Sequence, residues 1–186
     1  MKVFAFCLLP CALFFTACQP SAAPVSISNR PVSVNGIPQT NLPIPKDIEN
    51  LGWESFDGGQ RQKFSELKGK VVVLDFWATY CPPCLDEIPH LVELQRKHGD
   101  LQIVGLHVGG AEDRQKVAAF AQKLKINYPL ATPEDELNEA LLGSDFAIPQ
   151  TFVFDREGKL LKNFVGFDEN IKADLDRVVM QATGSK

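Results

Sequence analysis

The chain has 186 residues, of which 45% are hydrophobic and 23% are charged, so a globular domain of ordinary size is expected. Its formal net charge of −4 leaves no basic surplus to pair with phosphates, which argues against a nucleic-acid partner. No apolar run reaches the roughly 18 residues that a membrane-spanning helix needs, and this excludes a polytopic membrane protein.

The first 17 residues are typical of an export signal. Lys2 precedes an almost wholly apolar stretch from Val3 to Phe15, which contains no acidic residue and is too short for a stable anchor. The sequence Phe15-Thr16-Ala17-Cys18 resembles the cleavage box of bacterial lipoproteins. Cleavage there would make Cys18 the first mature residue, with lipid on its sulfur. Ordinary cleavage after Ser21-Ala22-Ala23, giving a soluble secreted protein, is the alternative.

Residues 18–45 are predicted to form a flexible tether. They contain six of the 13 prolines, together with Ser, Asn and few charges, and such a segment cannot bury enough apolar area to fold. The folded domain is therefore expected to comprise residues 46–186. On a lipid-bearing Cys18, the tether would hold this domain near a membrane while letting it rotate.

Hydrophobic periodicity within the domain predicts an α/β fold with a mixed sheet. Residues 71–77 form a near-continuous apolar run, which is typical of a central strand that is covered on both faces. The other predicted elements are a hairpin of 53–56 and 60–64, a helix over 82–98, a strand over 101–108, a helix around 117–124, a short helix starting at Pro133, a hairpin of 151–155 and 160–165, and a last helix around 171–179.

The cysteine pair is the feature that carries chemistry. Cys7 and Cys11 would leave with the signal and Cys18 would carry lipid, so Cys81 and Cys84 remain as thiols. They lie in the sequence Cys81-Pro82-Pro83-Cys84, where a buried strand turns into a helix. The N–H groups and the positive dipole end of a helix N-terminus stabilise a thiolate. Cys81 is therefore expected to be the exposed nucleophile.

Cys84 is predicted to be the resolving cysteine. It begins a stripe with Ile88 and Leu91 that faces the core, so it should be buried and protonated, one turn below Cys81. In thiol–disulfide exchange, Cys81 would attack a substrate disulfide and Cys84 would then resolve the mixed disulfide.

Two other interpretations of the pair fit the sequence less well. A zinc site needs four ligands, but His90 is on another face of the helix, His98 is about 21 Å further along it and His107 is on another strand, so no metal is expected. A purely structural disulfide closing a four-residue loop would restrain the unfolded chain very little.

Two further residues stand out. Asp75 interrupts the buried run and shares a strand face with Val73 and Trp77. It is either a strand-end aspartate that reaches solvent or a buried carboxylate with a raised pKa that takes the proton from Cys84. Pro149 follows Ile148 just before a predicted strand, where X–Pro bonds can be cis, and spacing alone leaves both isomers open.

These motifs resemble those of the thioredoxin superfamily. The shared residues are Trp77, the four residues Cys81 to Cys84, and Pro89, and the segments involved are 71–89 and 146–166. The runs Glu87-Ile88-Pro89 and Pro149 to Asp155 resemble the exported, membrane-tethered TlpA/ResA and cytochrome c maturation branch. Three positions depart from the pattern: Tyr80 stands for a tryptophan, Leu85 for a basic residue, and Gly105 for the lysine near the buried aspartate.

The resemblance implies a thioredoxin-like fold and a thiol:disulfide oxidoreductase that reduces disulfides of exported proteins such as apocytochrome c. It implies that Cys81 attacks, Cys84 resolves, Pro149 is cis, and no cofactor is used. The substrate groove would be formed by Trp77, Tyr80, Pro82, Ile148 and Pro149. Implied partners are protein disulfides and a membrane thiol donor of electrons, with the monomeric enzyme lipid-anchored at the periplasmic or cell-envelope face. The alternatives are a redoxin-type thiol peroxidase and a non-catalytic lipoprotein with a structural disulfide.

Overall fold

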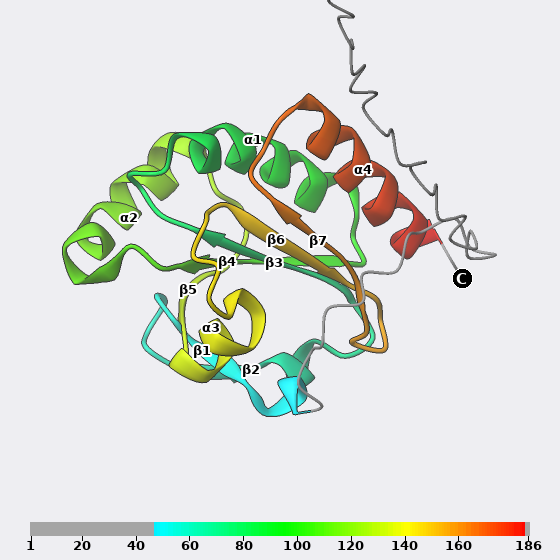
Figure 1. The fold of residues 1–186 in the computed structure, drawn as a ribbon, viewed down its shortest axis with the longest axis horizontal. Coiled ribbons are helices and arrows are strands. Elements are labelled where there is room, and N and C mark those ends of the chain that lie inside the picture. Colours follow the sequence, from blue (N-terminus) through cyan, green and yellow to red (C-terminus); the bar gives the residue numbers. More distant parts are fainter. Residues whose placement is uncertain (1–46, 185–186) are drawn as a thin grey trace, which may run out of the picture. The chain divides into compact units, whose positions relative to one another are not determined.

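The computed structural model describes residues 47–184, so the predicted export signal, Cys18 and the tether over 18–45 lie outside the described residues. Within this part, seven strands form one mixed sheet in the order β2-β1-β5-β4-β3-β6-β7 (Figure 1). The strands are β1 (Gly52–Ser55), β2 (Arg61–Lys63), β3 (Val71–Trp77), β4 (Leu101–His107), β5 (Leu130–Pro133), β6 (Gln150–Phe154) and β7 (Leu160–Val165). The helices are α1 (Pro82–Lys97), α2 (Gly110–Leu124), α3 (Asp135–Leu142) and α4 (Glu169–Gly184), with short 3₁₀ turns at Ile48–Asn50 and Phe64–Leu67.

Strand β3 is central and is buried on both faces, as its apolar run predicts. It pairs in parallel with β4 and antiparallel with β6. On one face, Val71 and Val73 pack with α1 and α4. On the other face, the strand residues Val72, Leu74 and Phe76 pack with Leu137 of α3. Figure 1 shows α1, α2 and α4 on one side of the sheet and α3 on the other, with the β1–β2 hairpin forming one edge of the sheet.

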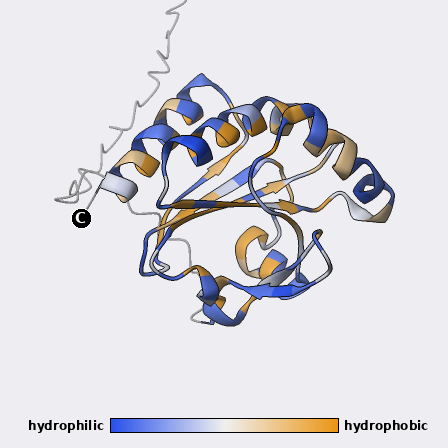
Figure 2. Cartoon of the chain, turned by 180° about the vertical axis from the view of Figure 1, so that it is seen from behind, coloured by the Kyte–Doolittle hydropathy of each residue, from blue (hydrophilic) through white to orange (hydrophobic). Residues whose placement is uncertain are grey.

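Both faces of the sheet are apolar, and the helices turn their polar sides outward (Figure 2). This arrangement fixes the orientation of β3: alternate residues face alternate layers, so Val73, Asp75 and Trp77 all point toward the layer of α1. The carboxyl group of Asp75 and the indole of Trp77 therefore lie beneath the start of α1.

Most predicted elements are confirmed, including both hairpins, the central strand and the helix that begins at Pro82. The predicted helix start at Pro133 is wrong. Pro133 ends β5, a strand that the sequence analysis did not predict, and α3 begins two residues later at Asp135. Backbone pairing of Trp53 with Pro133 extends the sheet there, because β1 covers that edge of β5.

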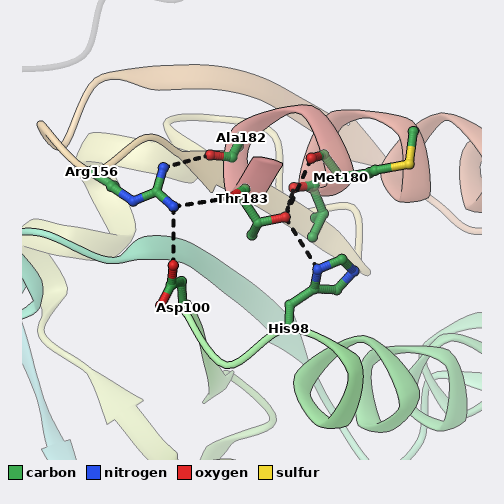
Figure 3. Close-up of polar contacts among 7 residues, drawn as sticks. His98, Asp100, Arg156, Met180, Ala182 and Thr183 are labelled. Carbon is green, nitrogen blue, oxygen red and sulfur yellow. Dashed lines mark hydrogen bonds and ion pairs between the residues drawn. The ribbon is translucent and has the colours of Figure 1, made fainter. Parts of the chain in front are cut away.

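The end of the sheet away from the cysteines is held by Arg156 (Figure 3). Its guanidinium donates to the carbonyl oxygens of Ala182 at 2.8 Å and Thr183 at 3.1 Å, and pairs with Asp100 at 3.3 Å. Thr183 also contacts Nδ1 of His98 at 3.1 Å. A cation on the last carbonyls of a helix satisfies groups that have no partner within the helix. These contacts fasten α4 to the ends of α1 and the β6–β7 turn.

Candidate active site

Cys81 and Cys84 are joined by a disulfide at the start of α1, with 5.3 Å between their Cα atoms. Cys81 is the residue that caps the helix, and its Sγ accepts a hydrogen bond from the backbone N–H of Cys84 at 3.2 Å. Pro82 occupies the first helical position, where no N–H is needed. A helix N-terminus thus points at the sulfur of Cys81, which is the environment that favours a thiolate.

The expectation that Cys81 is exposed is wrong for this disulfide-bonded form. Its exposed fraction is 5%, against 1% for Cys84, so both sulfurs are buried. The reason is the segment before β6: the carbonyl oxygen of Ile148 lies 3.5 Å from Sγ of Cys81. Both cysteines pack in one apolar cluster with Trp77 and Ile88, but the chain neighbours of Cys81, Tyr80 and Pro82, are exposed, so Cys81 is the sulfur nearer to the surface.

The peptide bond between Ile148 and Pro149 is cis, as the resemblance implies. The carbonyl oxygen of Pro149 accepts a hydrogen bond from the N–H of Gly166 at 2.8 Å, which ties the turn to the end of β7. Tyr80 is 63% exposed and Pro82 is also exposed, so both flank an accessible surface beside Cys81. Trp77 is fully buried and packs with both cysteines, so it lies inside the protein and supports the predicted substrate surface from within.

Below the disulfide lies a pair of buried carboxyl groups. Asp75, on β3, is 1% exposed, which rejects the alternative of a strand-end aspartate in solvent. Glu87, on α1, is fully buried and accepts a hydrogen bond from the hydroxyl of Thr151 at 2.6 Å. Thr151 stands opposite Asp75 in the sheet register, so Glu87 reaches down from the helix toward Asp75.

Burial makes both acids hard to ionise. It raises the pKa of Asp75 well above its ordinary value, and the nearby Glu87 carboxyl raises it further. Burial also raises the pKa of Glu87 to about 7, although the hydrogen bond from Thr151 acts in the opposite direction. Asp75 faces Gly105 across the β3–β4 pairing, at the position where the resembling family has a lysine, and no cation contributes to the pKa of Asp75. A carboxyl group in this state can accept and return a proton near neutral pH.

Glu87 was not among the functional residues predicted from the sequence, although its position on the helix indicates burial. Residues 84, 87, 88 and 91 follow the i, i+3, i+4, i+7 spacing of one helix face, so an acid at 87 shares the core-facing stripe of Cys84. An acidic residue on an apolar stripe predicts either a paired charge or a neutral acid.

A second buried network holds the loop that leads into Cys81. The carboxylate of Asp113, in the first turn of α2, accepts hydrogen bonds from the N–H of Thr79 at 2.8 Å and from its hydroxyl. It also lies 2.9 Å from Nε2 of His107 and 3.4 Å from Nζ of Lys116. Burial would raise the pKa of Asp113, but these hydrogen bonds, those of Thr79 first, outweigh it and lower the pKa. Asp113 therefore fixes the loop as an anion.

Asp113→Asn is expected to destabilise the protein by about 2–4 kcal/mol at neutral pH, because an amide cannot accept from all of these buried donors. The folded pKa of Asp113 lies below its ordinary value of 3.8, so its stabilising effect is present above that pH and is lost as the pH falls. Denaturant midpoints of both proteins should therefore converge under strongly acidic conditions. A constant difference at all pH values would contradict the assigned charge.

Within residues 47–184, no cluster of three His, Cys, Asp or Glu side chains is placed to hold a metal ion. In the same part of the chain, no helix is long and apolar enough to cross a membrane. The site as observed consists of a dithiol pair in its oxidised form, a cis-proline beside it, and two buried acids beneath it.

A cysteine pair at the start of a helix that follows a central strand, with a cis-proline facing it, defines a protein of the thioredoxin-like class. The family model described as Redoxin matches residues 42–179, and the chain belongs to this family. The predicted superfamily and fold are thereby confirmed.

Individual relatives agree with this assignment. The chain is 36% identical over 112 residues to the thiol-disulfide oxidoreductase ResA of Bacillus subtilis, covering 58% of this chain and 60% of ResA. It is 32% identical over 113 residues to the thioredoxin-like protein YneN of Bacillus subtilis, covering 58% of this chain and 64% of YneN. The matched part thus spans less than two thirds of these two relatives. A solved thiol:disulfide interchange protein of the thioredoxin family from Chlorobium tepidum is similar with a TM-score of 0.59 and 32% identity, covering 73% of this chain and 97% of that one.

Proposed function

We propose that the protein is a thiol:disulfide oxidoreductase that reduces disulfides of other proteins outside the cytoplasm. The observation that carries this proposal is the asymmetric cysteine pair above the buried acids. Cys81 caps the helix beside the exposed residues Tyr80 and Pro82, whereas Cys84 lies in the core with Asp75 and Glu87 in the layer beneath it. The names of its relatives, ResA and the interchange protein of Chlorobium tepidum, support the same reaction class.

The first step is nucleophilic attack by the reduced pair. The thiolate of Cys81 attacks one sulfur of a substrate disulfide, the substrate S–S bond breaks, and the other substrate sulfur leaves as a thiolate. The N–H of Cys84, which lies 3.2 Å from Sγ of Cys81, and the helix dipole stabilise the thiolate that attacks. The product is a mixed disulfide between Cys81 and the substrate.

The second step releases the substrate. The thiol of Cys84 gives its proton to the carboxylate of the buried acid pair, and the resulting thiolate attacks Sγ of Cys81. The mixed disulfide breaks, the substrate departs with two electrons gained, and the Cys81–Cys84 disulfide seen in the structure forms. Glu87 suits this role, because its pKa of about 7 lets it be ionised before the transfer and protonated after it.

An extended substrate segment would lie along the cis turn. Tyr80 and Pro82 offer exposed surface on one side of Cys81, and Ile148 and Pro149 form the other side. Backbone pairing of a substrate with the turn would bring its disulfide to Sγ of Cys81 irrespective of side-chain sequence. Such recognition suits a reductant of several protein clients, of which apocytochrome c is one example.

The N-terminal sequence supports a location outside the cytoplasm. The apolar stretch from Val3 to Phe15 and the box ending at Cys18 favour export and a lipid anchor, with residues 18–45 as the tether. The oxidised protein would then be reduced by a membrane thiol donor and act as a monomer. Simple secretion after Ala23 is the alternative location.

Turnover of a protein disulfide and of hydrogen peroxide by the reduced protein tests the reaction class. We expect disulfide reduction to be fast, peroxide consumption to be slow, and both to be lost in Cys81→Ser. Fast peroxide consumption without disulfide reduction would favour the thiol peroxidase. Absence of both activities, with a disulfide that strong reductant opens only in unfolded protein, would favour a non-catalytic lipoprotein.

A further inference from the structure

We propose that Thr151 is a positioning residue for the step in which Cys84 releases the substrate. Its hydroxyl holds one oxygen of Glu87, so that the other oxygen is the one that takes the proton of Cys84. This inference rests on the proposed function, in which Glu87 accepts that proton before Cys84 attacks Sγ of Cys81.

The register of the sheet aims Thr151 at α1. Thr151 lies on β6 and is the direct partner of Asp75 on β3 in the antiparallel pairing. Partners in such a pairing project from the same face of the sheet, and Asp75 faces the layer of α1. Thr151 is 0% exposed, and its hydroxyl donates a hydrogen bond to Oε1 of Glu87 at 2.6 Å. A side chain of the strand therefore fixes a side chain of the helix.

The two oxygens of Glu87 have different surroundings. Oε1 accepts the hydrogen bond from Thr151, whereas Oε2 is buried without a hydrogen-bond partner among residues 47–184. In a neutral carboxyl group the carbonyl oxygen is the better acceptor, so a donor that holds Oε1 favours the acidic proton on Oε2. The hydroxyl of Thr151 thus selects the oxygen of Glu87 that receives a proton.

The helix places Glu87 close to Cys84. Both residues lie on α1, and side chains three positions apart share one face of a helix, with their Cβ atoms about 5–6 Å apart. Side chains on a helix lean toward its N-terminus, so the carboxyl group of Glu87 lies over the turn that carries Cys84. Cys84 is 1% exposed, so a buried base on the same face is better placed than bulk water to take its proton.

The transfer from Cys84 to Glu87 moves one proton and no electrons. The S–H bond of Cys84 breaks and an O–H bond forms at Oε2 of Glu87, while the hydrogen bond from Thr151 to Oε1 stays in place. The thiolate of Cys84 then forms the S–S bond to Sγ of Cys81, and the substrate sulfur leaves with the electron pair of the bond that breaks. Thr151 neither gains nor loses a proton, so it acts through Glu87.

The hydrogen bond from Thr151 also keeps Glu87 available as a base. Burial raises the pKa of Glu87 and the hydrogen bond from Thr151 lowers it, with a result of about 7. The other titratable groups around Glu87 are Cys84 on its own helix, Asp75 on β3 and Tyr128 before β5. None of these three groups carries a positive charge that could replace the hydrogen bond. Without the hydroxyl, less of Glu87 would be ionised at neutral pH.

The test is the rate at which Cys84 releases an aromatic thiol from a mixed disulfide with Cys81. The reduced full-length protein is mixed with the disulfide of thionitrobenzoate in acid, and release of the thiol is followed after a jump to between about pH 6 and pH 9. In Thr151→Val, which keeps the shape of the side chain, we expect the rate at neutral pH to fall roughly five- to tenfold and the midpoint of the pH profile to rise by about one pH unit. Thr151→Ser keeps a hydroxyl and should stay within about twofold of the wild type.

A second threonine provides the matched control. Oγ1 of Thr132 on β5 is buried without a hydrogen-bond partner in the described part of the chain, so Thr132→Val should release the thiol as the wild type does. Adding Thr151→Val to Glu87→Gln tests the route of the effect. Because glutamine has no titrating proton, the added change should alter the rate by less than about twofold. Thr151→Ala, which also lacks the hydroxyl, replaces Thr151→Val if that variant does not fold.

The outcomes separate the role of Thr151 from the function on which it rests. A normal rate and pH profile in Thr151→Val, beside a slow Glu87→Gln, would overturn the role of Thr151 alone. A loss that is equal at every pH, that Thr151→Ser shares, or that adds in full to the effect of Glu87→Gln would also overturn it, because it would indicate a structural role. A normal rate in Glu87→Gln would instead refute Glu87 as the proton acceptor, and a wild-type protein that releases no thiol would refute the proposed oxidoreductase.

Discussion

The Cys84→Ser variant is expected to accumulate a covalent mixed disulfide between Cys81 and a protein substrate, with turnover lower by about a thousandfold or more. The physical reason is proximity. In the structure the Cα atoms of the two cysteines are 5.3 Å apart, so the attack that releases the substrate is intramolecular. A serine hydroxyl cannot replace the attacking thiolate of Cys84. External thiols reach Cys81 only slowly, since the exposed fraction of Cys81 is 5% in the structure.

Non-reducing electrophoresis and intact mass measure the adduct directly. The wild-type protein should show only a transient adduct, and Cys81→Ser should show none, because Cys84 is buried in the core beside Trp77. If Cys81→Ser forms the stable adduct and Cys84→Ser still turns over, the roles assigned to the two sulfurs are reversed. Peptide mapping of the adduct then identifies the attacking sulfur.

The order of elements and the cysteine site could be predicted from the sequence because each depends on local patterns. Alternation along β3 places Asp75 on the face of Val73 and Trp77, and a continuous apolar run predicts burial of both faces. The cysteine spacing and Pro82 predict the helix start, which the structure confirms. These features need only the period of one strand or the first turn of one helix.

Other features depend on contacts between distant segments, and no local pattern contains them. Cys81 is buried because Ile148, 67 residues further along the chain, lies against its sulfur. Asp113 is buried because Thr79 and His107 meet it from two other segments. Strand β5 has only four residues and ends in a proline, so its composition does not predict a strand. It is a strand because it pairs with β1 and β4.

Glu87 depends both on a local pattern and on contacts between distant segments. Its helical spacing from Cys84, which can be read from the sequence, places it on the buried face of α1. Its proximity to Asp75 and Thr151 depends on the sheet register. Asp75 and Glu87 come from a strand and from the helix that follows it, so the strand–helix packing brings two acids into one apolar layer. Neither acid has a cation to offset its burial among the causes that shift its pKa. The folded site therefore holds at least one proton that the unfolded chain releases near neutral pH.

That proton makes stability depend on pH, and Glu87→Gln is expected to remove much of the dependence. The pKa of Glu87 is 4.5 when unfolded and about 7 when folded, so the folded state retains a proton that the unfolded state loses within this range. Stability from this group is full below pH 4.5 and falls as the pH rises through 7. At about 1.4 kcal/mol for each pH unit, the wild-type loss due to Glu87 is about 3 kcal/mol.

Urea unfolding of the oxidised protein between about pH 5 and pH 8 measures this loss without interference from thiol titration. Glu87→Gln keeps an oxygen that can accept from Thr151 and carries no titrating proton, so its stability should fall less over this range and should exceed that of the wild type at pH 8. Asp75 retains its own dependence, so a residual slope is expected. Glu93→Gln, an exposed acid on the same helix, is the matched control and should follow the wild type. A wild-type protein whose stability rises toward pH 8 would show that Glu87 is ionised in the folded state, and the proposed proton transfer from Cys84 would then need another acceptor.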